Sequence, residues 1–586
     1  MSGLTPVASA RVARDRLRRT QIATAVVAAI VVVTVVLHVV WLVRFRRADI
    51  VEWDEAGYMQ FSLSNYDALR EQGPWTFAKT VAGRETFGPF FPFVTSLAYP
   101  ITGRSIFGGL LVMPLFFVGL VAATYGLARQ LVSSSWAVVA ALTVAAIPAV
   151  TDYTRLFHFA LPATACMTAA LWALVRTEGW RRRQWAVAFG VLVALTWLSR
   201  TMTVAYAPAL ALAAGTQFFV GPPDLRAKAR NLGFAVGAAV LIAGPWYIRN
   251  ARSVYDNLAG TGYGAEAARY GQRHSVASWD YWTAELRLDL VHLGLPLAVA
   301  LLLCFCMALA SLLARCRIPL LGRRWTVRTA AVLALAIVVV EGYLVLTTSR
   351  NEGTGYALPW LPALVVLAVT AAVSVPTRTL RVGLAGILVA VSLVGVASKS
   401  GWVEPLAKVR RVSVPGFGEV PVTDGRGVIQ EEFEGAGYDI GKPTQPLPAM
   451  HREWIPLARD VVGWSLRRAE QRGEPLNLML GIDDGLFSNS RLILAAQLEY
   501  HRFLPVDYLH ASDAGDTVAS YRHQLALPRQ TNALVVGRPP PNGSSVTRGK
   551  VEAAAHSLGF VPVRSFTMPD GRRIWVWWRD IQGDAP

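Results

Sequence analysis

The sequence has little charge and few cysteines for its length. Only 16% of its 586 residues are charged, whereas 53% are hydrophobic, a balance that argues against an ordinary soluble domain. The four cysteines are Cys166, Cys304, Cys306 and Cys316. Three of them fall within apolar runs, and no pair has metal-ligand spacing in a polar segment. A disulfide framework and a zinc site are therefore not expected, and the cysteines are interpreted as packing residues.

The sequence also shows no internal repeat and no low-complexity tract. The inverted repeats of many transporters are not evident. The basic N-terminal stretch "ARVARDRLRRT" is followed by an apolar run over residues 22–43. This run is too long for a signal-peptide core, and it ends in "WLVRFRR" rather than in a small-residue cleavage site. It predicts an uncleaved first membrane helix with a cytoplasmic N-terminus.

Apolar runs of about 18 residues or more, long enough to cross a bilayer as a helix, recur along the chain. They predict a polytopic α-helical membrane protein with about eleven spans. The expected spans are 22–43, 106–128, 133–150, 158–176, 185–199, 202–220, 231–248, 290–314, 329–347, 357–374 and 381–398.

The positive charge is distributed unevenly between alternate loops. The connections "RTEGWRRRQ", "GPPDLRAKARN", "RCRIPLLGRRWTVR" and "VPTRTLR" are rich in arginine, whereas the short loops between them carry a single arginine each. The positive-inside rule places the basic set in the cytoplasm. The net charge of +18 is therefore interpreted as a topology signal, with no nucleic-acid partner. The outer side then holds the loops 44–105 and 249–289 and everything after about residue 400.

Residues 401–586 differ in composition from the apolar module at 1–400 and contain no spanning run. "LNLMLGI" and "NALVVG" predict buried strands, "SNSRLILAAQLEYH" and "VTRGKVEAAAHSLGF" predict helices, and "VPVRSFTMPDGRRIWVWW" predicts a hairpin. The sequence thus predicts a C-terminal extracytoplasmic α/β domain. The acidic "GIDDGLF" at 481–487 does not match a twelve-residue calcium loop and is interpreted as a turn at the end of a strand.

Polar residues that orientation does not require gather on the expected outer side. Asp54 and Glu55 lie in the first outer loop, within "VEWDEAGYMQF". Arginines on this side are Arg155, Arg200, Arg249 and Arg350. A guanidinium group has forked donors that match phosphate oxygens, and a nearby carboxylate can act as general base for a hydroxyl. The pattern favours transfer of a sugar from a lipid phosphate to a hydroxyl group.

Four motifs resemble one family of enzymes. "WDEAGYM" is similar to the Asp-Glu motif in the first outer loop of GT-C membrane glycosyltransferases. It resembles in particular the group that contains protein O-mannosyltransferases and lipid A aminoarabinose transferases (glycosyltransferase family 39 and relatives). "GPWYIRN", "GYALPWLPALVVL" and "GRETFGPFFPFVTSLAYPITG" resemble further segments of that group. The resemblance covers about residues 20–375 and implies a GT-C fold.

The resemblance also implies an activity and a site. Such enzymes use polyprenyl-phosphate sugars, invert the anomeric carbon and need no nucleotide sugar, flavin or other cofactor. By analogy, Asp54 takes the place of the catalytic base, and Glu55 places the acceptor or shares the role of base. Arg249 and Arg350 match best the positions that bind the donor phosphate, with Arg155 and Arg200 as further candidates. The residues expected to shape the sugar or lipid pocket are Tyr58, Trp246 and Tyr356.

Two positions leave questions open. Related sequences often carry a second acid near the second outer loop, where this chain has His158 and, close by, Asp152. No metal is therefore expected. Glu341 lies inside the ninth expected span, where an acid is costly and is a functional candidate. It is expected either to face the pocket or to pair with a polar neighbour.

Other interpretations of the same residues stay open. Arg155 and Arg200 are also suited to anchoring helix ends in lipid headgroups, and "PWYIRN" also fits an interfacial aromatic belt. His38 and His292 are interpreted as satisfied helix residues. The expected function is an inverting glycosyltransferase of the bacterial plasma membrane, with a lipid-linked sugar as donor and a polysaccharide, lipid or protein as acceptor. The alternatives are a transporter or flippase of lipid-linked substrates and a non-catalytic scaffold for envelope assembly.

Overall fold

The structure is a computed structural model of the chain. It describes residues 6–46, 51, 53–83, 86–221, 224–264, 275, 277–314, 326–349, 355–427, 430–431, 434, 453–482, 484, 486–510, 516–526, 531–538 and 546–579.

The chain divides into two compact units. The helical unit comprises Met1–Val40, Ala82–Phe91 and Met113–Gly425, and the α/β unit comprises Trp41–Val81, Pro92–Val112 and Arg426–Pro586. The α/β unit thus contains two segments from the first expected outer loop in addition to the C-terminal region. The division into 1–400 and 401–586 stays a prediction from composition.

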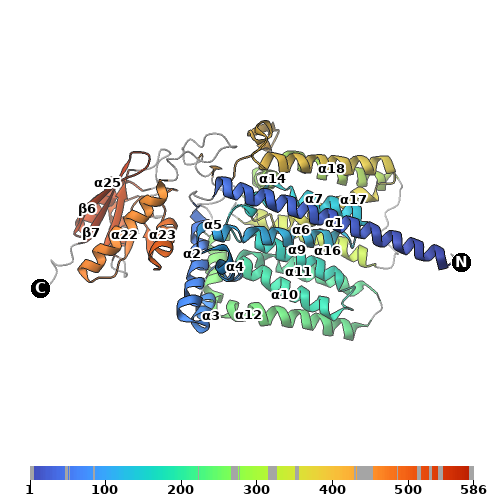
Figure 1. Cartoon of the computed structure of the whole chain (residues 1–586), viewed down its shortest axis with the longest axis horizontal. Coiled ribbons are helices and arrows are strands. Elements are labelled where there is room, and N and C mark those ends of the chain that lie inside the picture. Colours follow the sequence, from blue (N-terminus) through green and yellow to red (C-terminus); the bar gives the residue numbers. More distant parts are fainter. Residues whose placement is uncertain are drawn as a thin grey trace. The chain divides into compact units, whose positions relative to one another are not determined.

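The helical unit consists of helices that run roughly alongside one another (Figure 1) and one short β-hairpin. Its elements are α1 (Pro6–Phe45), α6 (Met113–Ala128), α7 (Ser134–Ala145), α8 (Pro148–Thr154), α9 (Ala160–Arg176), α10 (Arg183–Ser199), η2 (Thr201–Tyr206), α11 (Ala207–Thr216), η3 (Gln217–Phe219), α12 (Leu225–Tyr263), α14 (Trp279–Leu293), α15 (Leu295–Leu313), α16 (Val327–Thr348), α17 (Leu361–Ser374), α18 (Arg378–Lys399), α19 (Glu404–Ala407), β1 (Arg410–Val414) and β2 (Gly418–Thr423). The last turn of α1, from Trp41 onward, belongs to the α/β unit.

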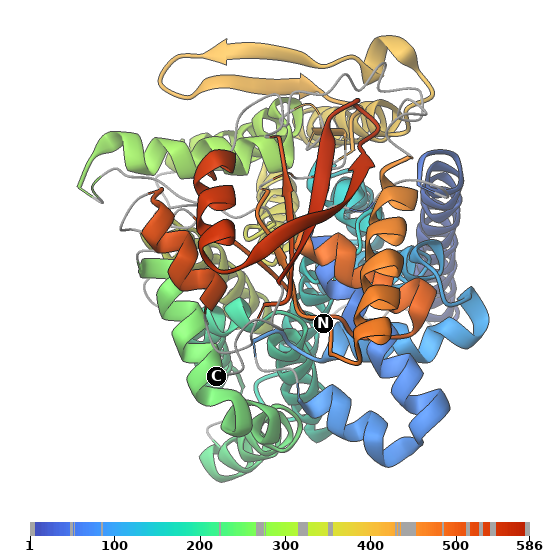
Figure 2. The same ribbon diagram turned by 90° about the vertical axis from the view of Figure 1, so that its left-hand side faces the viewer.

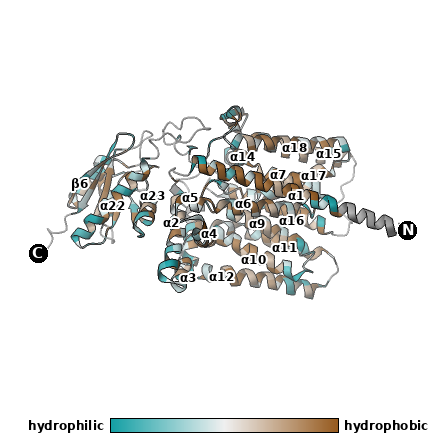
Figure 3. Ribbon diagram, in the orientation of Figure 1, coloured by the Kyte–Doolittle hydropathy of each residue, from teal (hydrophilic) through white to brown (hydrophobic). Residues whose placement is uncertain are grey.

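The helices confirm a multi-pass membrane protein. Among the described residues, seven helices are long and apolar enough to cross a membrane, or eight if α7 and α8 form one broken span. Four shorter apolar helices, α4 (Phe90–Thr102), α9, α10 and α17, complete the set. Each expected span coincides with one of these helices or with the bent pair, while the number of eleven crossings stays a prediction. Figure 3 shows apolar residues along α1, α6, α7, α9 and α18.

The expected span 133–150 is not one straight helix. The axis turns by 63° between α7 and α8. Pro148 begins α8, and a proline has no N–H to donate to the carbonyl four residues earlier, so the helix is interrupted just before it. The expected outer loop 249–289 is also partly helical, because α12 continues to Tyr263 and α14 begins at Trp279.

Small residues allow the helices of this unit to approach closely. A Cβ atom added to Gly190 on α10 would lie 1.9 Å from the carbonyl oxygen of Ala235 on α12. One added to Gly126 on α6 would lie 2.5 Å from the indole ring of Trp172 on α9. In an apolar environment such contacts, rather than the hydrophobic effect, hold helices together.

The α/β unit contains a five-stranded mixed sheet and helices. The elements that lie wholly or mostly in it are α2 (Trp53–Asp67), η1 (Ala68–Gln72), α3 (Pro74–Ala82), α4 (Phe90–Thr102), α5 (Ile106–Leu110), α22 (Trp454–Arg472), β3 (Leu478–Leu480), α23 (Asn489–Tyr500), β4 (Val506–Tyr508), α24 (Val518–Ala526), β5 (Ala533–Gly537), α25 (Arg548–Ser557), β6 (Phe560–Thr567) and β7 (Arg573–Arg579). The strand order is β4-β3-β5-β7-β6. β3 is parallel to β4 and β5, whereas β7 is antiparallel to β5 and β6.

Helices cover both faces of this sheet (Figure 2). On β5, Val535 packs in the core formed with α22 and α23, whereas its neighbours Leu534 and Val536 pack in the core formed with α24 and α25. This alternation follows from the two-residue period of a strand. The structure contains the two predicted strands, the two predicted helices and the final hairpin of the C-terminal region. Its identity as a domain of its own stays a prediction.

Candidate functional site

The two adjacent carboxylates of the first outer segment have different surroundings. Both occupy the first turn of α2, where the positive end of the helix dipole favours acids. Asp54 is exposed, whereas Glu55 is 0% exposed. Nη2 of Arg46, just after the end of α1, donates to Oε2 of Glu55 over 2.6 Å. Asp54 is therefore the accessible carboxylate of the two, and Glu55 ties the start of α2 to the turn after α1.

The ion pair between Arg46 and Glu55 is buried, with side-chain exposures of 3% and 0%. Removing one partner of such a pair leaves an uncompensated charge and typically costs about 3–5 kcal/mol. We expect Arg46→Met to lower the melting temperature of the purified protein markedly. Arg46→Met/Glu55→Gln should lower it less, because no buried charge is left unpaired.

The matched control for this prediction is Glu470→Gln. Glu470 pairs with Arg502 over 2.9 Å, but both side chains are more than half exposed. Exposed pairs contribute about 0–1 kcal/mol, so little change is expected. A melting temperature of Arg46→Met equal to that of wild type would show that the buried pair does not hold α2.

Tyr58 lies one helical turn after Asp54 on α2. Residues four apart share one face of a helix, so Tyr58 is a neighbour of Asp54. Its side chain is buried, with 6% exposed. Its proposed part in shaping the sugar pocket stays a prediction.

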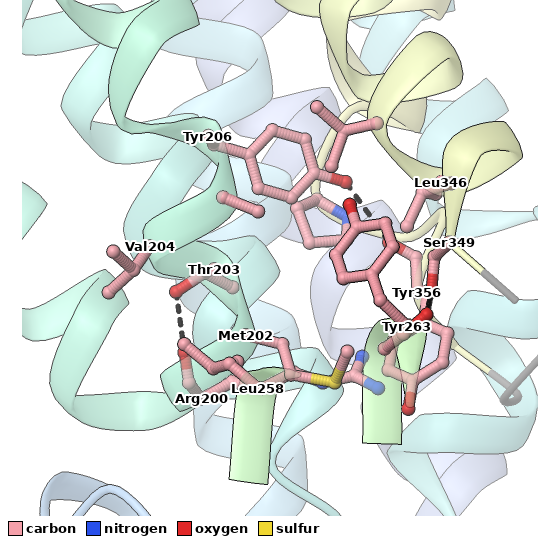
Figure 4. A pocket seen from close by; sticks show the side chains of 14 residues that line it. Arg200, Met202, Thr203, Val204, Tyr206, Leu258, Tyr263, Leu346, Ser349 and Tyr356 are labelled. Carbon is pink, nitrogen blue, oxygen red and sulfur yellow. Dashed lines mark hydrogen bonds between the residues drawn. The ribbon is translucent and has the colours of Figure 1, made fainter. Parts of the chain in front are cut away.

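The helical unit contains a cavity of about 240 Å³. The end of α12, the end of α16, the η2 turn and the segment before α17 form its walls (Figure 4). The lining residues are Arg200, Met202, Thr203, Val204, Ala205, Tyr206, Leu258, Gly262, Tyr263, Val345, Leu346, Ser349, Tyr356 and Pro359. Apart from one arginine and a few hydroxyl groups this lining is apolar, which suits a hydrocarbon chain that carries one anionic group.

Arg200 is the only charged residue among the described residues that line this cavity. It follows the last residue of α10 in extended conformation, and only 4% of it is exposed. Its Nη1 donates to the carbonyl oxygen of Gly355 over 2.7 Å, and its guanidinium carbon lies 4.1 Å from the ring centre of Tyr356. Its Nε has no hydrogen-bond partner within the described part of the chain. A buried cation with a spare donor is suited to an anion.

Gly355 positions Arg200. Its φ is +75°, a conformation that L side chains rarely adopt. Its carbonyl accepts from Arg200, and its N–H donates to Nε2 of His292 over 3.3 Å. A Cβ atom here would lie 2.5 Å from Cζ of Tyr153 on α8. Only a glycine at position 355 therefore allows the segment before α17 to approach Tyr153 on α8 this closely.

We expect Gly355→Ala to lower kcat/KM for a lipid-phosphate donor by about tenfold or more, because misplacing a contact group by a fraction of an ångström has effects of this size. Gly416→Ala is the control. Gly416 also has positive φ, at +80°, but a Cβ atom there would meet nothing within 4 Å. Equal effects of the two substitutions would contradict the positioning role.

The other predicted arginines have different surroundings. Arg155 donates through Nε to Nδ1 of His38 and through Nη1 to the carbonyl of Lys399, over 3.2 and 2.5 Å. Burial lowers the pKa of Arg155 to about 9, so it is still charged at neutral pH. Arg249 is exposed on α12, and Arg350 lies outside the described residues. Their roles toward a donor phosphate stay predictions.

Of the remaining candidates for the pocket, one lines the cavity and two do not. Tyr356 lines the cavity beside Arg200. Trp246 is buried on α12 in a cluster with Leu198 and Val254, and Glu341 lies partly buried on α16; neither lines the cavity. Asp152 accepts from Nζ of Lys399 over 2.7 Å.

Several site residues were not predicted from the sequence. Arg46 lies in a basic cluster that the sequence suggests only as the end of a span. Gly355 begins the motif "GYALPWLPALVVL", but the sequence does not show that its carbonyl oxygen accepts from Arg200. Tyr206 and Tyr263 line the cavity from separate elements. Nε2 of His292 accepts from the N–H of Gly355, while the interpretation of His292 as a satisfied helix residue stays a prediction.

One group of potential metal ligands occurs among the described residues. The ligand atoms of Asp67, Glu71 and His501 lie within 4.8 Å of one another. Both carboxylate oxygens of Asp67 already accept hydrogen bonds from Arg104. The charge of Asp67 is therefore already balanced by a cation.

Comparison with solved structures shows the fold. The chain is similar to ArnT from Cupriavidus metallidurans bound to undecaprenyl phosphate, with a TM-score of 0.52, 16% identity and coverage of 94% of this chain and 98% of ArnT. It is also similar to the arabinofuranosyltransferase AftD from Mycobacteria, with a TM-score of 0.53 and 13% identity. That match covers 94% of this chain and 39% of AftD. The protein therefore has the fold of GT-C membrane glycosyltransferases, as its sequence motifs predict.

Sequence comparison gives a more local likeness. Residues 86–247 match the family described as dolichyl-phosphate-mannose-protein mannosyltransferase. No curated protein sequence matches the chain significantly. The matched segment contains the end of α10 and Arg200.

Proposed function

We propose that this protein is an inverting glycosyltransferase that moves a sugar from a polyprenyl-phosphate donor to a hydroxyl acceptor. Arg200 carries this proposal, because it is a buried guanidinium with a spare donor in an otherwise apolar cavity. Such a cavity fits an isoprenoid chain with a phosphate at its end. The GT-C fold and the undecaprenyl phosphate bound to ArnT support the same donor class.

In the proposed reaction, Asp54 accepts the proton of the acceptor hydroxyl as the hydroxyl oxygen bonds to the anomeric carbon. The bond between that carbon and the phosphate oxygen breaks, and its electron pair stays on the phosphate. Arg200 stabilises the negative charge that develops on the leaving polyprenyl phosphate. Attack from the side opposite the phosphate inverts the anomeric carbon.

The proposed setting is the outer face of a bacterial plasma membrane, with a cytoplasmic N-terminus and an extracytoplasmic C-terminal domain. The arginine-rich alternate loops support this orientation. The proposed role is the synthesis of envelope polysaccharide, with a pentose such as arabinose or a hexose such as mannose as the sugar.

The test is product formation by the purified full-length protein. The protein in detergent is given radiolabelled undecaprenyl-phosphate arabinose or mannose together with envelope glycan fragments as acceptors. Transfer of label to a glycan, with release of undecaprenyl phosphate, supports the proposal. Movement of the labelled lipid across reconstituted vesicles without transfer would instead support a flippase. The absence of both transfer and lipid movement would support a non-catalytic scaffold.

A further inference from the structure

Helix α2, which carries Asp54 in its first turn, packs along a helix of the C-terminal region. Near the start of both helices, a Cβ atom on Gly57 would lie 3.7 Å from Oγ of Ser490 on α23. Near their ends, Nε2 of Gln497 donates to Oδ2 of Asp67 over 2.6 Å. The two helices therefore run side by side in the same direction within the α/β unit.

Arg104 joins the ends of these two helices. It lies between α4 and α5 and donates through Nε and Nη2 to the two carboxylate oxygens of Asp67, both over 2.7 Å. Nη2 also donates to the carbonyl of Gln497 over 2.6 Å, and Nη1 donates to the carbonyl of Leu498 over 3.1 Å. One guanidinium group thus holds the last residue of α2 and the last turn of α23.

The surroundings make this contact strong. The side chains of Arg104 and Asp67 are 13% and 10% exposed, and Gln497 is 3% exposed. A forked guanidinium–carboxylate pair is both stronger and more directional than a single hydrogen bond. The carbonyl groups at the end of α23 carry the negative end of its dipole, which also favours a cation. Lysine could supply the charge but not four bonds in these fixed directions.

We propose that Arg104 is a positioning residue, through which α23 of the C-terminal region fixes α2 and so the carboxylate of Asp54. This inference rests on the proposed function. Asp54 and Asp67 are on one continuous helix, about 20 Å apart at 1.5 Å per residue. A helix held at its far end and along one side cannot tilt, and a tilt of an ångström at Asp54 is enough to slow proton transfer. The C-terminal region would thus influence the reaction through the position of α2, whichever acceptor the enzyme uses.

Kinetics of the full-length protein test this proposal. Arg104→Gln and Arg104→Lys are each expected to lower kcat by about 10–100-fold while donor KM changes less than about twofold. Asp67→Asn keeps the shape of the partner and should give a smaller loss. In the Asp54→Asn background, Arg104→Gln should have almost no further effect, because its influence is exerted through Asp54.

Hydrogen exchange gives a readout that does not depend on activity. Amides of α2 should exchange faster in Arg104→Gln, while those of β3, β5 and β7 stay protected. Arg502→Gln is the control, since Arg502 also follows α23 while its side chain forms an exposed pair with Glu470. It should leave both kcat and exchange unchanged.

Three results would overturn the proposal. The first is a wild-type kcat in Arg104→Gln or Arg104→Lys. The second is a fall in kcat on Arg104→Gln that is as large in the Asp54→Asn background as in the wild-type background. The third is an unchanged rate of amide hydrogen exchange in α2 of Arg104→Gln. If wild type transfers no sugar from any donor, the proposed function fails, and the exchange comparison alone then decides whether Arg104 holds α2.

Discussion

Asp54→Asn is expected to lower kcat for sugar transfer by about 10²–10⁴-fold, the usual contribution of a general base. Asparagine has the shape of aspartate but cannot take the proton of the acceptor hydroxyl. The donor KM should change little, because the donor phosphate is proposed to bind at Arg200. Transfer from a radiolabelled polyprenyl-phosphate sugar by purified protein measures both constants.

Two comparisons sharpen this experiment. Asp507→Asn changes another exposed aspartate, on β4, and should leave the rate unchanged. Glu55→Gln should reduce the rate far less than Asp54→Asn, because its amide oxygen can still accept from Arg46. Wild-type rates in Asp54→Asn would dismiss Asp54 as the base, and a larger loss in Glu55→Gln would transfer that role to Glu55.

Arg200→Gln is expected to lower kcat/KM for the donor by about 10²–10³-fold. Effects of this size follow the loss of one group that stabilises developing negative charge. The loss should appear in both constants, because Arg200 would bind the phosphate before the reaction and stabilise it as it leaves. Arg200→Lys should not restore activity, since an ammonium group cannot stack on Tyr356, donate to Gly355 and reach a phosphate together.

Arg252→Gln is the matched control for Arg200. Arg252 lies on the C-terminal part of helix α12, and its side chain is 96% exposed. Its substitution should change donor kinetics by less than about twofold. If Arg252→Gln and Arg200→Gln weaken the donor equally, the phosphate is attracted by general positive charge and not by the buried cavity.

Local properties predicted most of the fold. A run such as Leu295–Leu313 is apolar throughout, and its insertion depends on hydrophobicity summed over one helix. The strand Ala533–Gly537 and the hairpin of β6 and β7 were predictable for a similar reason, because their apolar residues and turn are adjacent in sequence. The bend before Pro148 was missed, although proline is a local signal, because apolar residues continue across it.

The site was only partly predictable. The Asp-Glu motif indicated Asp54 and Glu55 together, and only the structure distinguishes an exposed carboxylate from a buried one paired with Arg46. Of the four outer arginines, the sequence motifs favoured Arg249 and Arg350 over Arg155 and Arg200. Arg200 became the leading candidate because the cavity, Tyr356 and Gly355 surround it, whereas Arg155 bonds to His38 and Lys399.

The amino-acid sequence by itself determined that this protein enters the membrane, that its C-terminal region forms an α/β domain, and that it resembles GT-C enzymes. These properties follow from hydrophobicity, charge and motifs that act over a few turns of chain. The tertiary structure decided which charged groups are buried and which have a spare donor. It also decided that Arg104 joins Asp67 to Gln497, which is 430 residues away in the sequence. Burial and hydrogen bonding depend on neighbours in space, and distant segments supply those neighbours only after folding.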